Sequence, residues 1–484
     1  MAVTSRLKNQ HLLWRAAFGP MAENIADLDA MLTKNLWLQL VDGSAEQSEK
    51  ITVTTNIIAE RAQQQNKMEM DAMQSEQNKK AVRVQSREAL KNLNMDWMSE
   101  MINSKAQLRE KVAFFWHGHF ASRILNGFAQ QELLQIIRSN ALGNFGMLLS
   151  SVSKSPSMLQ FLNNQQNRKG KPNENFAREV MELFTMGQGA YSEKDVKEAA
   201  RAFTGWGFNV QGEFVFRKLV HDDGIKTFLG KTGNFDGDDI IKILLEQMAT
   251  AHFITRKIYS YFVNEQANEA HVKMLSKRFF ASNYNILQLL TDIFTSDFFY
   301  EQENIGNKIK SPVELMVGIR RLLPLTLNNE AIQLIFQRAL GQILFYPPNV
   351  AGWPGGKNWI DSSTLMVRLQ LPKVLAANES ITLSPKTDDD DEMGEMMAEQ
   401  IQTKKLEFNN NNGAANAIDW KLIFAAFEQT KRPVLFTTIA SCLLQDKDNI
   451  SEALLANYID NSNRESYVRS VVLHLMCTPE YQLC

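Results

Sequence analysis

Apolar side chains recur every three or four positions along most of this 484-residue chain. That spacing is the period of an amphipathic helix, so the pattern predicts a mainly α protein. Strand-like alternation is confined to "GFNVQGEFVFRKL" (207–219), which predicts a small hairpin, and the following "IKTFLG" (225–230) is expected to add a short third strand. The predicted helices cover residues 105–119, 128–150, 174–186, 193–204, 238–249, 251–263, 268–280, 285–297, 311–323 and 329–340.

Several of the predicted helices carry recognisable end signals. Ser192 precedes "EKDVKEAARAF", and Asp195 occupies the acidic position of a capping box. Asp236 stands where the N-cap of "GDDIIKILLEQM" should lie. Gly187 follows "ENFAREVMELFTM" as a C-terminal stop. These residues therefore predict where individual helices begin and end.

Composition divides the chain into three parts. Residues 1–375 carry the helical pattern and predict one large multi-helix domain, with a polar helical insertion at 55–100. Residues 376–417 are rich in Asp and Asn and predict a linker or an exposed insertion. Helical periodicity returns over 418–484, and we expect these helices to pack on the main domain.

The stretch "YPPNVAGWPGGKNWID" is dense in Pro, Gly and Trp. It predicts an ordered irregular loop near 346–362, held by Trp353 and Trp359 rather than by a ladder of hydrogen bonds. Large ordered loops in helical proteins often line sites, and they also serve to complete cores. The mainly α fold is thus expected to contain one small β-hairpin near 207–230 and this loop.

The charge balance excludes several classes of partner. Lys and Arg number 52 against 54 Asp and Glu, so no basic field indicates nucleic acid and no polybasic block indicates a membrane surface. No apolar run is long enough to span a bilayer, and "MAVTSRLKNQHLLWRAAFGP" lacks the hydrophobic region of a signal peptide. As written, the chain is expected in the cytoplasm. Its three cysteines match no zinc or disulfide spacing and are interpreted as free thiols.

A histidine pair, His117 and His119, lies inside the helical pattern "LREKVAFFWHGHFASR". Two helical residues turn by ~200°, so the pair cannot hold one metal ion unless the helix yields at Gly118. His119 falls on the apolar stripe and should point inward, whereas His117 falls on the Glu110 side. Three interpretations stay open: both rings are structural, one serves a site while the other packs, or the helix ends near Gly118 and both converge.

Three charged residues, Arg178, Glu179 and Glu182, fall outside the apolar arc of the predicted helix 174–186. Two carboxylates at this spacing can chelate a metal ion or share acid–base work, and the arginine can hold an anionic group. The simpler interpretation is a surface ion pair between Arg178 and Glu182.

A second polar group lies around the predicted hairpin. His221 and Asp222 open "HDDGIKTFLG", where Asp and Gly are ordinary turn residues. A His-Asp pair on a loop also suits metal binding or acid–base chemistry. Lys226 in the same segment and Trp206 before the hairpin are candidate substrate contacts.

These segments, taken in order, resemble the bacterial family catalogued as domain of unknown function 1800. The resemblance rests on "HLLWRAAFGP", "LREKVAFFWHGHFASR", "NENFAREVMELFTMGQGAYSEKDVKEAARAFTGWGF", "HDDGIKTFLG", "KSPVELMVGIRR" and "YPPNVAGWPGGKNWIDSSTLMVRL". It runs from about residue 8 to about residue 375, and weakly through the C-terminal helices. It implies a mostly helical fold and a periplasmic or exported location. The sequence departs from this second expectation because it shows no signal peptide. It also implies a candidate partner protein from a neighbouring exported family related to sulfatases and alkaline phosphatases, but no established activity.

The sequence leaves three functions open. The first is a hydrolase for a polar or anionic ester or glycan, whose candidate catalytic residues are His117, His119, Arg178, Glu179, Glu182, His221 and Asp222. A divalent metal, the candidate cofactor, would be held by His119, Glu179 and His221. Substrate would be contacted by Arg178, Lys226, Trp206 and Trp353. The alternatives are a non-catalytic envelope or assembly protein whose motif residues form a buried polar network, and a carbohydrate-binding protein that uses tryptophan faces.

Overall fold

Helices form most of the chain in this computed structural model, which describes residues 3–56, 72–327, 329–377, 381–382, 405–406, 417–446 and 450–484. The mainly α fold expected from the sequence is confirmed. Residues 57–71 of the predicted polar insertion, and most of the predicted linker 376–417, lie outside the described residues. In the ranges that are described, no helix is both long and apolar enough to cross a membrane.

The first half of the chain contributes the helices up to α10. They are α1 Ser5–Ala16, α2 Thr33–Asp42, α4 Ala72–Asn103, α5 Gln107–His119, α6 Gly127–Asn140, α7 Phe145–Ser153, α8 Pro156–Phe161, α9 Glu174–Glu182 and α10 Glu193–Ala202. The second half contributes the rest. They are α11 Gly237–Leu245, α12 Met248–Phe262, α13 Glu269–Ala281, α14 Ile286–Phe294, α15 Pro312–Leu322, α16 Ile332–Leu340, α17 Ser362–Ala377, α19 Lys421–Phe427, α20 Arg432–Leu443, α21 Glu452–Leu455 and α22 Arg464–Met476.

The described strands are short and form two-stranded antiparallel sheets. They are β1 Trp206–Phe208 with β2 Phe214–Phe216, β3 Lys226–Phe228 with β4 Lys231–Gly233, β5 Leu325–Thr326 with β8 Ala417–Ile418, and β6 Ile381–Thr382 with β7 Lys405–Leu406.

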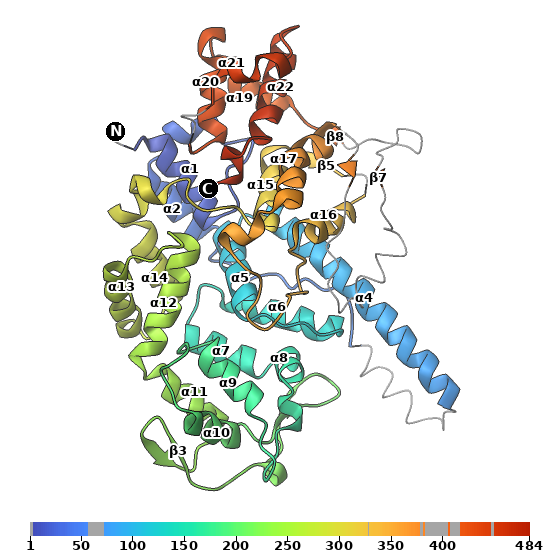
Figure 1. Cartoon of the computed structure of the whole chain (residues 1–484), viewed down its shortest axis with the longest axis vertical. Helices are drawn as coiled ribbons and strands as arrows, with labels where there is room; N and C mark the ends of the chain where they lie inside the picture. The colour runs from blue at the N-terminus through green and yellow to red at the C-terminus, as the bar shows by residue number, and fades with distance from the viewer. Residues whose placement is uncertain are drawn as a thin grey trace.

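Figure 1 shows an elongated molecule with α5 near its centre. Helices α19 to α22 gather at one end, and α7 to α11 gather with β3 at the other. Helices α12, α13 and α14 run along one side, while α4 slants outward on the opposite side. Both chain ends lie near α1, where the Arg15 guanidinium donates to the Cys484 carbonyl at 2.8 Å.

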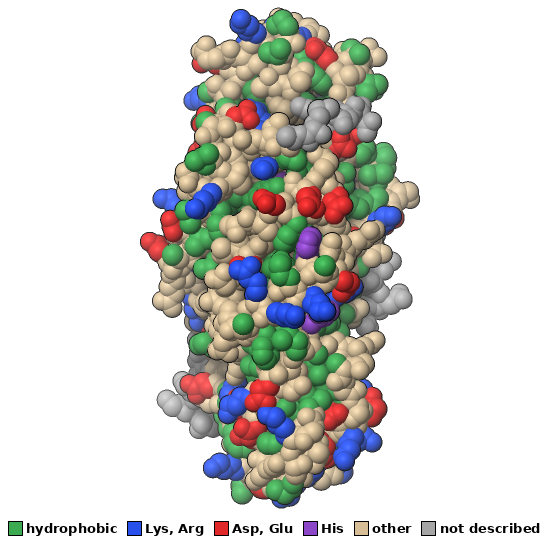
Figure 2. All heavy atoms as spheres, turned by 90° about the vertical axis from the view of Figure 1, so that its left-hand side faces the viewer, with side chains coloured by type: hydrophobic (Ala, Val, Ile, Leu, Met, Phe, Trp, Pro, Cys, Tyr) green, Lys and Arg blue, Asp and Glu red, His purple; other side chains and the backbone are tan. Residues whose placement is uncertain are grey.

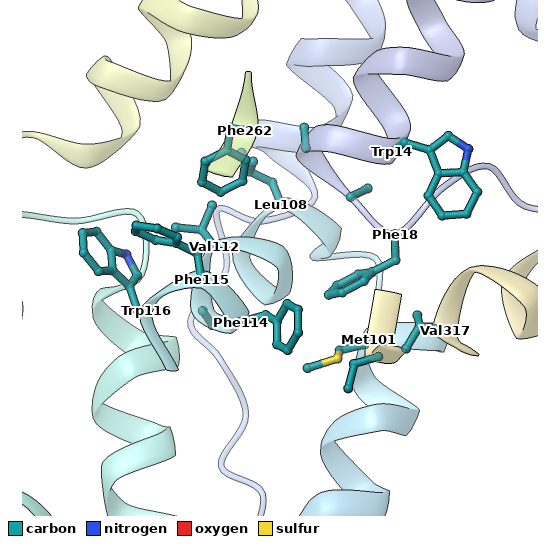
Figure 3. Close-up of a cluster of buried hydrophobic side chains, with 14 of the residues drawn as sticks. Trp14, Phe18, Met101, Leu108, Val112, Phe114, Phe115, Trp116, Phe262 and Val317 are labelled. Atoms are coloured by element: carbon teal, nitrogen blue, oxygen red, sulfur yellow. The ribbon is translucent and has the colours of Figure 1, made fainter. Parts of the chain in front are cut away.

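Helix α5 lies in the core although many of its residues are polar or charged. All its residues except Gly118 are buried, and its charged side chains find partners in the core: Glu110 pairs with Arg138 at 2.9 Å, and Lys111 pairs with Glu314. Phe114 packs towards Phe18, with ring centroids 6.0 Å apart, and Phe115 contacts Phe262 of α12 at 5.7 Å (Figure 3). Each large side chain buried here contributes about 1.5–3 kcal/mol to stability. This packing fixes the direction of every side chain on α5.

The prediction of a single helix over 128–150 is wrong, because the chain forms two helices there, α6 and α7. Helices α6 and α7 are separated by a turn, and Asn144 caps α7 by accepting a hydrogen bond from the Met147 N–H at 3.0 Å. The apolar period continues through the turn, which hid the break in the sequence. The capping box expected at Ser192 is confirmed. The N-cap expected at Asp236 is confirmed as well, and it forms a capping box with Asp239.

The region near 207–230 contains two hairpins rather than one. The first is the predicted hairpin, in which Trp206 pairs opposite Phe216. The segment "IKTFLG" does not add a third strand to it, but pairs with β4 in a second hairpin. Leu229 and Gly230 both have positive φ, 45° and 80°, so the chain reverses directly after β3.

The Pro/Gly/Trp loop at 346–361 packs directly on α5. Gly352 has φ +86°, and a Cβ atom there would lie 2.4 Å from the Gly118 carbonyl oxygen, so the contact requires glycine. Trp359 is buried, and the Trp353 ring lies 5.3 Å from the His117 ring. The loop is ordered as predicted, and it forms a wall beside the C-terminal end of α5.

Residues 482–484 support a neighbouring wall. Ile309 and Leu483 form an antiparallel bridge, and Lys308 and Cys484 exchange backbone hydrogen bonds of 3.1 and 2.8 Å. The segment 308–311, which leads into α15, is thereby fixed in an extended conformation next to α5.

Candidate functional site

His117 is buried in the core and makes structural contacts. The Phe345 N–H donates to its Nε2 at 3.2 Å, so Nδ1 carries the proton. The ring also packs edge-on against Trp97, with centroids 5.1 Å apart. Burial lowers the pKa of His117 to about 3, which keeps the imidazole neutral at ordinary pH.

His119 faces a different side of α5 from His117. Its Nε2 lies 3.3 Å from the Phe184 carbonyl oxygen, which can only accept, so Nε2 carries the proton. Nδ1 is therefore the acceptor, and the Lys257 ammonium donates to it at 3.3 Å. Burial and the Lys257 charge hold the pKa of His119 well below its ordinary value. The pair therefore consists of a neutral histidine and a lysine, and the two histidines do not converge.

Lys257 has an unusual environment for a lysine. Its Nζ also lies 3.3 Å from the Leu183 carbonyl and 5.0 Å from the centre of the Phe253 ring. Burial lowers its pKa to about 8. No carboxylate of the described residues pairs with it, so its positive charge is compensated only by neutral groups.

Lys257 and His119 both line a cleft of about 540 Å³. The cleft lies between α5, α12, the segment 308–314 and the loop 346–361, and Tyr261 and Trp353 also line it. Its volume suits a small polar ligand. Of the residues predicted from the sequence, the structure brings His119 and Trp353 together in this cleft.

A second charged group lies at the back of the cleft. Glu314 forms ion pairs with Lys111, which is fully buried, and with Lys308 at 3.1 Å. It also accepts from the Ser311 N–H at 2.8 Å. Burial opposes ionisation, but Lys111 and Lys308 outweigh it and hold the pKa of Glu314 well below its usual range. Lys308 also lies 3.9 Å above the Tyr261 ring, so its charge is directed at the cleft wall.

Arg178, Glu179 and Glu182 do not line this cleft. Arg178 pairs with Glu193 at 2.7 Å and with Glu174 at 3.4 Å, instead of the expected Glu182. Glu182 accepts from the Tyr191 hydroxyl at 2.8 Å. Glu179 is half-buried, and burial followed by the nearby Glu182 raises its pKa. These contacts brace α9 against the start of α10.

The group around the second hairpin is also separate from the cleft. The His221 Nδ1 lies 2.8 Å from the Thr204 carbonyl oxygen. Asp222 accepts two hydrogen bonds from Arg201, at 2.8 and 3.1 Å, and this contact lowers the pKa of Asp222 to about 2. Lys226 is buried and donates to the carbonyls of Asp222 and Gly224, at 2.5 and 3.0 Å.

Trp206 belongs to the core of the same region rather than to the cleft. It is buried, and its ring packs against Phe203 with centroids 5.1 Å apart. The Lys154 ammonium lies 5.3 Å from its ring centre.

The three candidate metal ligands, His119, Glu179 and His221, are not assembled into one site. Across the described ranges, no group of three or more His, Cys, Asp or Glu side chains could hold a metal ion. The Nε2 of His119 and the Nδ1 of His221 are both committed to backbone carbonyls. No metal-dependent chemistry follows from these residues.

The main residues missed from the sequence are Lys257, Lys308 and Glu314. Lys257 sits in "TAHFITRKIYSYF", where one lysine among apolar residues is expected to extend into solvent. Glu314 carried a detectable signal, because Ser311 and Glu314 form a capping box at the start of α15. That signal predicts a helix start and contains no hint of the lysines that surround the carboxylate.

Comparison with known proteins identifies a family without an assigned activity. A sequence model of the family described as "Protein of unknown function (DUF1800)" matches residues 11–483. No curated protein and no solved structure matches the chain significantly.

Proposed function

The chain belongs to this DUF1800 family of proteins of unknown function, and we propose that its central cleft binds an anionic carbohydrate ester and hydrolyses it. The observation that carries the proposal is Lys257, a half-buried cation in an open cleft that has no carboxylate partner among the described residues. A buried charge without a counter-ion is costly unless a ligand supplies the opposite charge. Strongly perturbed lysines in clefts are typical of functional sites.

The overall charge of the cleft supports an anionic ligand. Arg256, Lys257 and Lys308 line it, against the carboxylates of Glu265 and Glu314. Glu314 is already neutralised by its two lysine partners, one of which lies behind the cleft wall. A carboxylate or a sulfate on the ligand would therefore meet a net positive surface.

The aromatic residues of the cleft support a carbohydrate as the ligand. Trp353, Trp359 and Tyr261 line the cleft together with Phe115. Aromatic faces pack well against the apolar faces of sugar rings, while their polar edges remain available for hydrogen bonds. A rigid tryptophan loop beside cationic side chains thus fits a sugar that carries an acidic group.

The Lys257–His119 pair supplies the chemistry. While Arg256 and Lys308 hold the anionic group, the neutral form of the Lys257 amine can take a proton from a water molecule, whose oxygen then attacks the ester carbon. The neutral imidazole of His119 accepts one N–H of Lys257, which orients the amine lone pair. After the ester C–O bond breaks, the ammonium returns the proton to the leaving alkoxide. Because the pKa of Lys257 is about 8, hydrolysis should accelerate as the pH rises towards that value.

The test separates binding from hydrolysis with two substitutions of Lys257. The probes are mono- and trisaccharides that bear carboxylate, sulfate or phosphate groups, each with and without an O-acetyl ester. Lys257→Met should weaken binding by at least about tenfold and abolish acetate release. Lys257→Arg keeps the charge and cannot act as the base, so it should bind but not hydrolyse.

The matched control is Lys242→Met, at an exposed lysine on α11 whose side chain is 71% exposed. It should behave as the unsubstituted protein in both assays. The proposal is overturned if no probe of the set binds, or if Lys257→Met binds the acidic probes as tightly as the unsubstituted protein.

A second candidate function is that of a non-catalytic protein whose motif residues stabilise the fold. The ion pairs of Arg178 with Glu193 and of Arg201 with Asp222 favour it, because they tie α9, α10 and the second hairpin together. Under this alternative, Arg178→Gln would lower stability, and no variant of the cleft would affect any ligand. Calorimetric unfolding together with the binding assay distinguishes the two.

A further inference from the structure

A second cavity lies beside the central cleft. It is a groove of about 720 Å³ between α12, α13 and the turn after α9. Its polar lining includes Arg256, Lys273 and Lys277, with Glu269 as the acidic member. Phe253 also lines the groove. It lies so close to Gly187 that a Cβ atom added to residue 187 would be 2.7 Å from the phenyl ring.

The groove and the cleft follow one another along α12. Met248, His252 and Phe253 line the groove, and Lys257 and Tyr261, further along the helix, line the cleft. At 1.5 Å per residue, the lined stretch of α12 is about 20 Å long, which exceeds a single sugar ring.

Two side chains join the cavities. Arg256 lines both. Lys257 lines the cleft, and its ammonium lies 5.0 Å from the centre of the Phe253 ring in the groove. The two cavities therefore adjoin at Arg256.

The charge of the groove continues that of the cleft. Lys273 and Lys277 stand one helical turn apart on α13, and both are exposed. Neither forms an ion pair with any described residue, whereas Arg256 pairs with Glu269. Figure 2 looks onto the side that carries α12, α13 and α14, and it shows Lys, Arg and His side chains across the middle of this face, below a row of Asp and Glu side chains.

We propose that the ligand is an anionic oligosaccharide of several acidic units, which occupies the cleft with one end and the groove with the next units. This inference rests on the proposed function of the cleft and names its substrate class. Arg256 contacts the ligand where it passes from the cleft to the groove. There it gives up its ion pair with Glu269 and pairs with an acidic group of the ligand. Lys273 and Lys277 bind the acidic groups of the units in the groove.

The test compares ligands of different length on the full chain. The probes are digalacturonate and hexagalacturonate, titrated calorimetrically at one salt concentration. The hexamer should bind at least about tenfold more tightly than the dimer. The double variant Lys273→Ala, Lys277→Ala should lose most of that advantage, while the affinity for the dimer stays within about twofold.

A matched control addresses unspecific attraction of polyanions. Lys194→Ala, Lys197→Ala removes two exposed lysines from one helix, α10, outside both cavities, and should leave both affinities unchanged. A hexamer of glutamate serves as the peptide alternative. If it binds more tightly than hexagalacturonate, the ligand is an acidic peptide and the proposal is overturned.

The two proposals fail in different ways. If dimer and hexamer bind with equal affinity and Lys257→Met weakens the binding of both, the proposed role of the groove is overturned, and the proposed role of the cleft stands. Loss of hexamer binding in the α13 variant with no effect of Lys257→Met would instead overturn the proposed role of the cleft.

Discussion

Lys257 should weaken the fold that contains it, because burial disfavours its charged form. Its pKa is about 8 in the folded protein, against an ordinary value of 10.5. Between these values the unfolded chain binds more protons than the folded chain, so stability should rise as the pH increases from about 8 to about 10.5. The difference corresponds to ~3 kcal/mol, which is the full cost of the buried charge below pH 8.

Lys257→Met should therefore stabilise the protein at pH 7. The substitution removes the charge, and it also removes the hydrogen bonds to His119 and Leu183, which are worth about 1 kcal/mol in total. The expected net gain is about 2 kcal/mol at pH 7, and most of it should disappear by pH 10, where the folded amine is neutral. A variant that is more stable and also unable to bind ligand would be the signature of a functional residue.

Equilibrium urea unfolding, followed by circular dichroism at pH 7 and pH 10, measures the effect. Lys242→Met again provides the exposed control and should change stability by less than about 0.5 kcal/mol at either pH. The reasoning is refuted if Lys257→Met is less stable than the unsubstituted protein at pH 7. It is equally refuted if the difference between the two proteins does not depend on pH.

Three further substitutions test other parts of the structure. Glu314→Gln leaves the buried Lys111 amine without its counter-ion and should lower the free energy of unfolding by about 3–5 kcal/mol, whereas replacing both partners by apolar residues should cost less. Gly352→Ala introduces a Cβ atom 2.4 Å from the Gly118 carbonyl oxygen at positive φ, and calorimetry should show a loss of about 1–3 kcal/mol. Asp222→Asn should cost about 1 kcal/mol above pH 4, and this cost should vanish in urea titrations as the pH falls through about 2, the pKa of the folded carboxyl.

The sequence predicted the helices well because each depends on local periodicity and local caps. The N-terminal caps at Ser192 and Asp236 follow from residues within one or two turns, and so does the helical environment of the histidine pair. The break between α6 and α7 was missed because the apolar period continues across it. The prediction that His119 points inward follows from the same periodicity, and the ring is buried.

The candidate site was much harder to predict because its parts are far apart in the sequence. Lys257 lies 138 positions from His119, and Lys111 lies 203 positions from Glu314. A helical wheel gives the direction of a side chain and not the partner that it meets. The charged residues that stood out in the motif of α9 face outward and pair with neighbours, whereas an inconspicuous lysine of α12 reaches the cleft.

The bridge between Ile309 and Leu483 determines when the cleft can form during synthesis of the chain. The cleft wall at 308–311 is fixed by backbone hydrogen bonds to residues 482–484, more than 170 positions later in the chain. A ribosome will have synthesised α5, α12 and the tryptophan loop well before those residues emerge. The nascent protein should therefore hold most of its core while this wall is still unsupported, and ligand binding should appear only after residues 482–484 have left the ribosome.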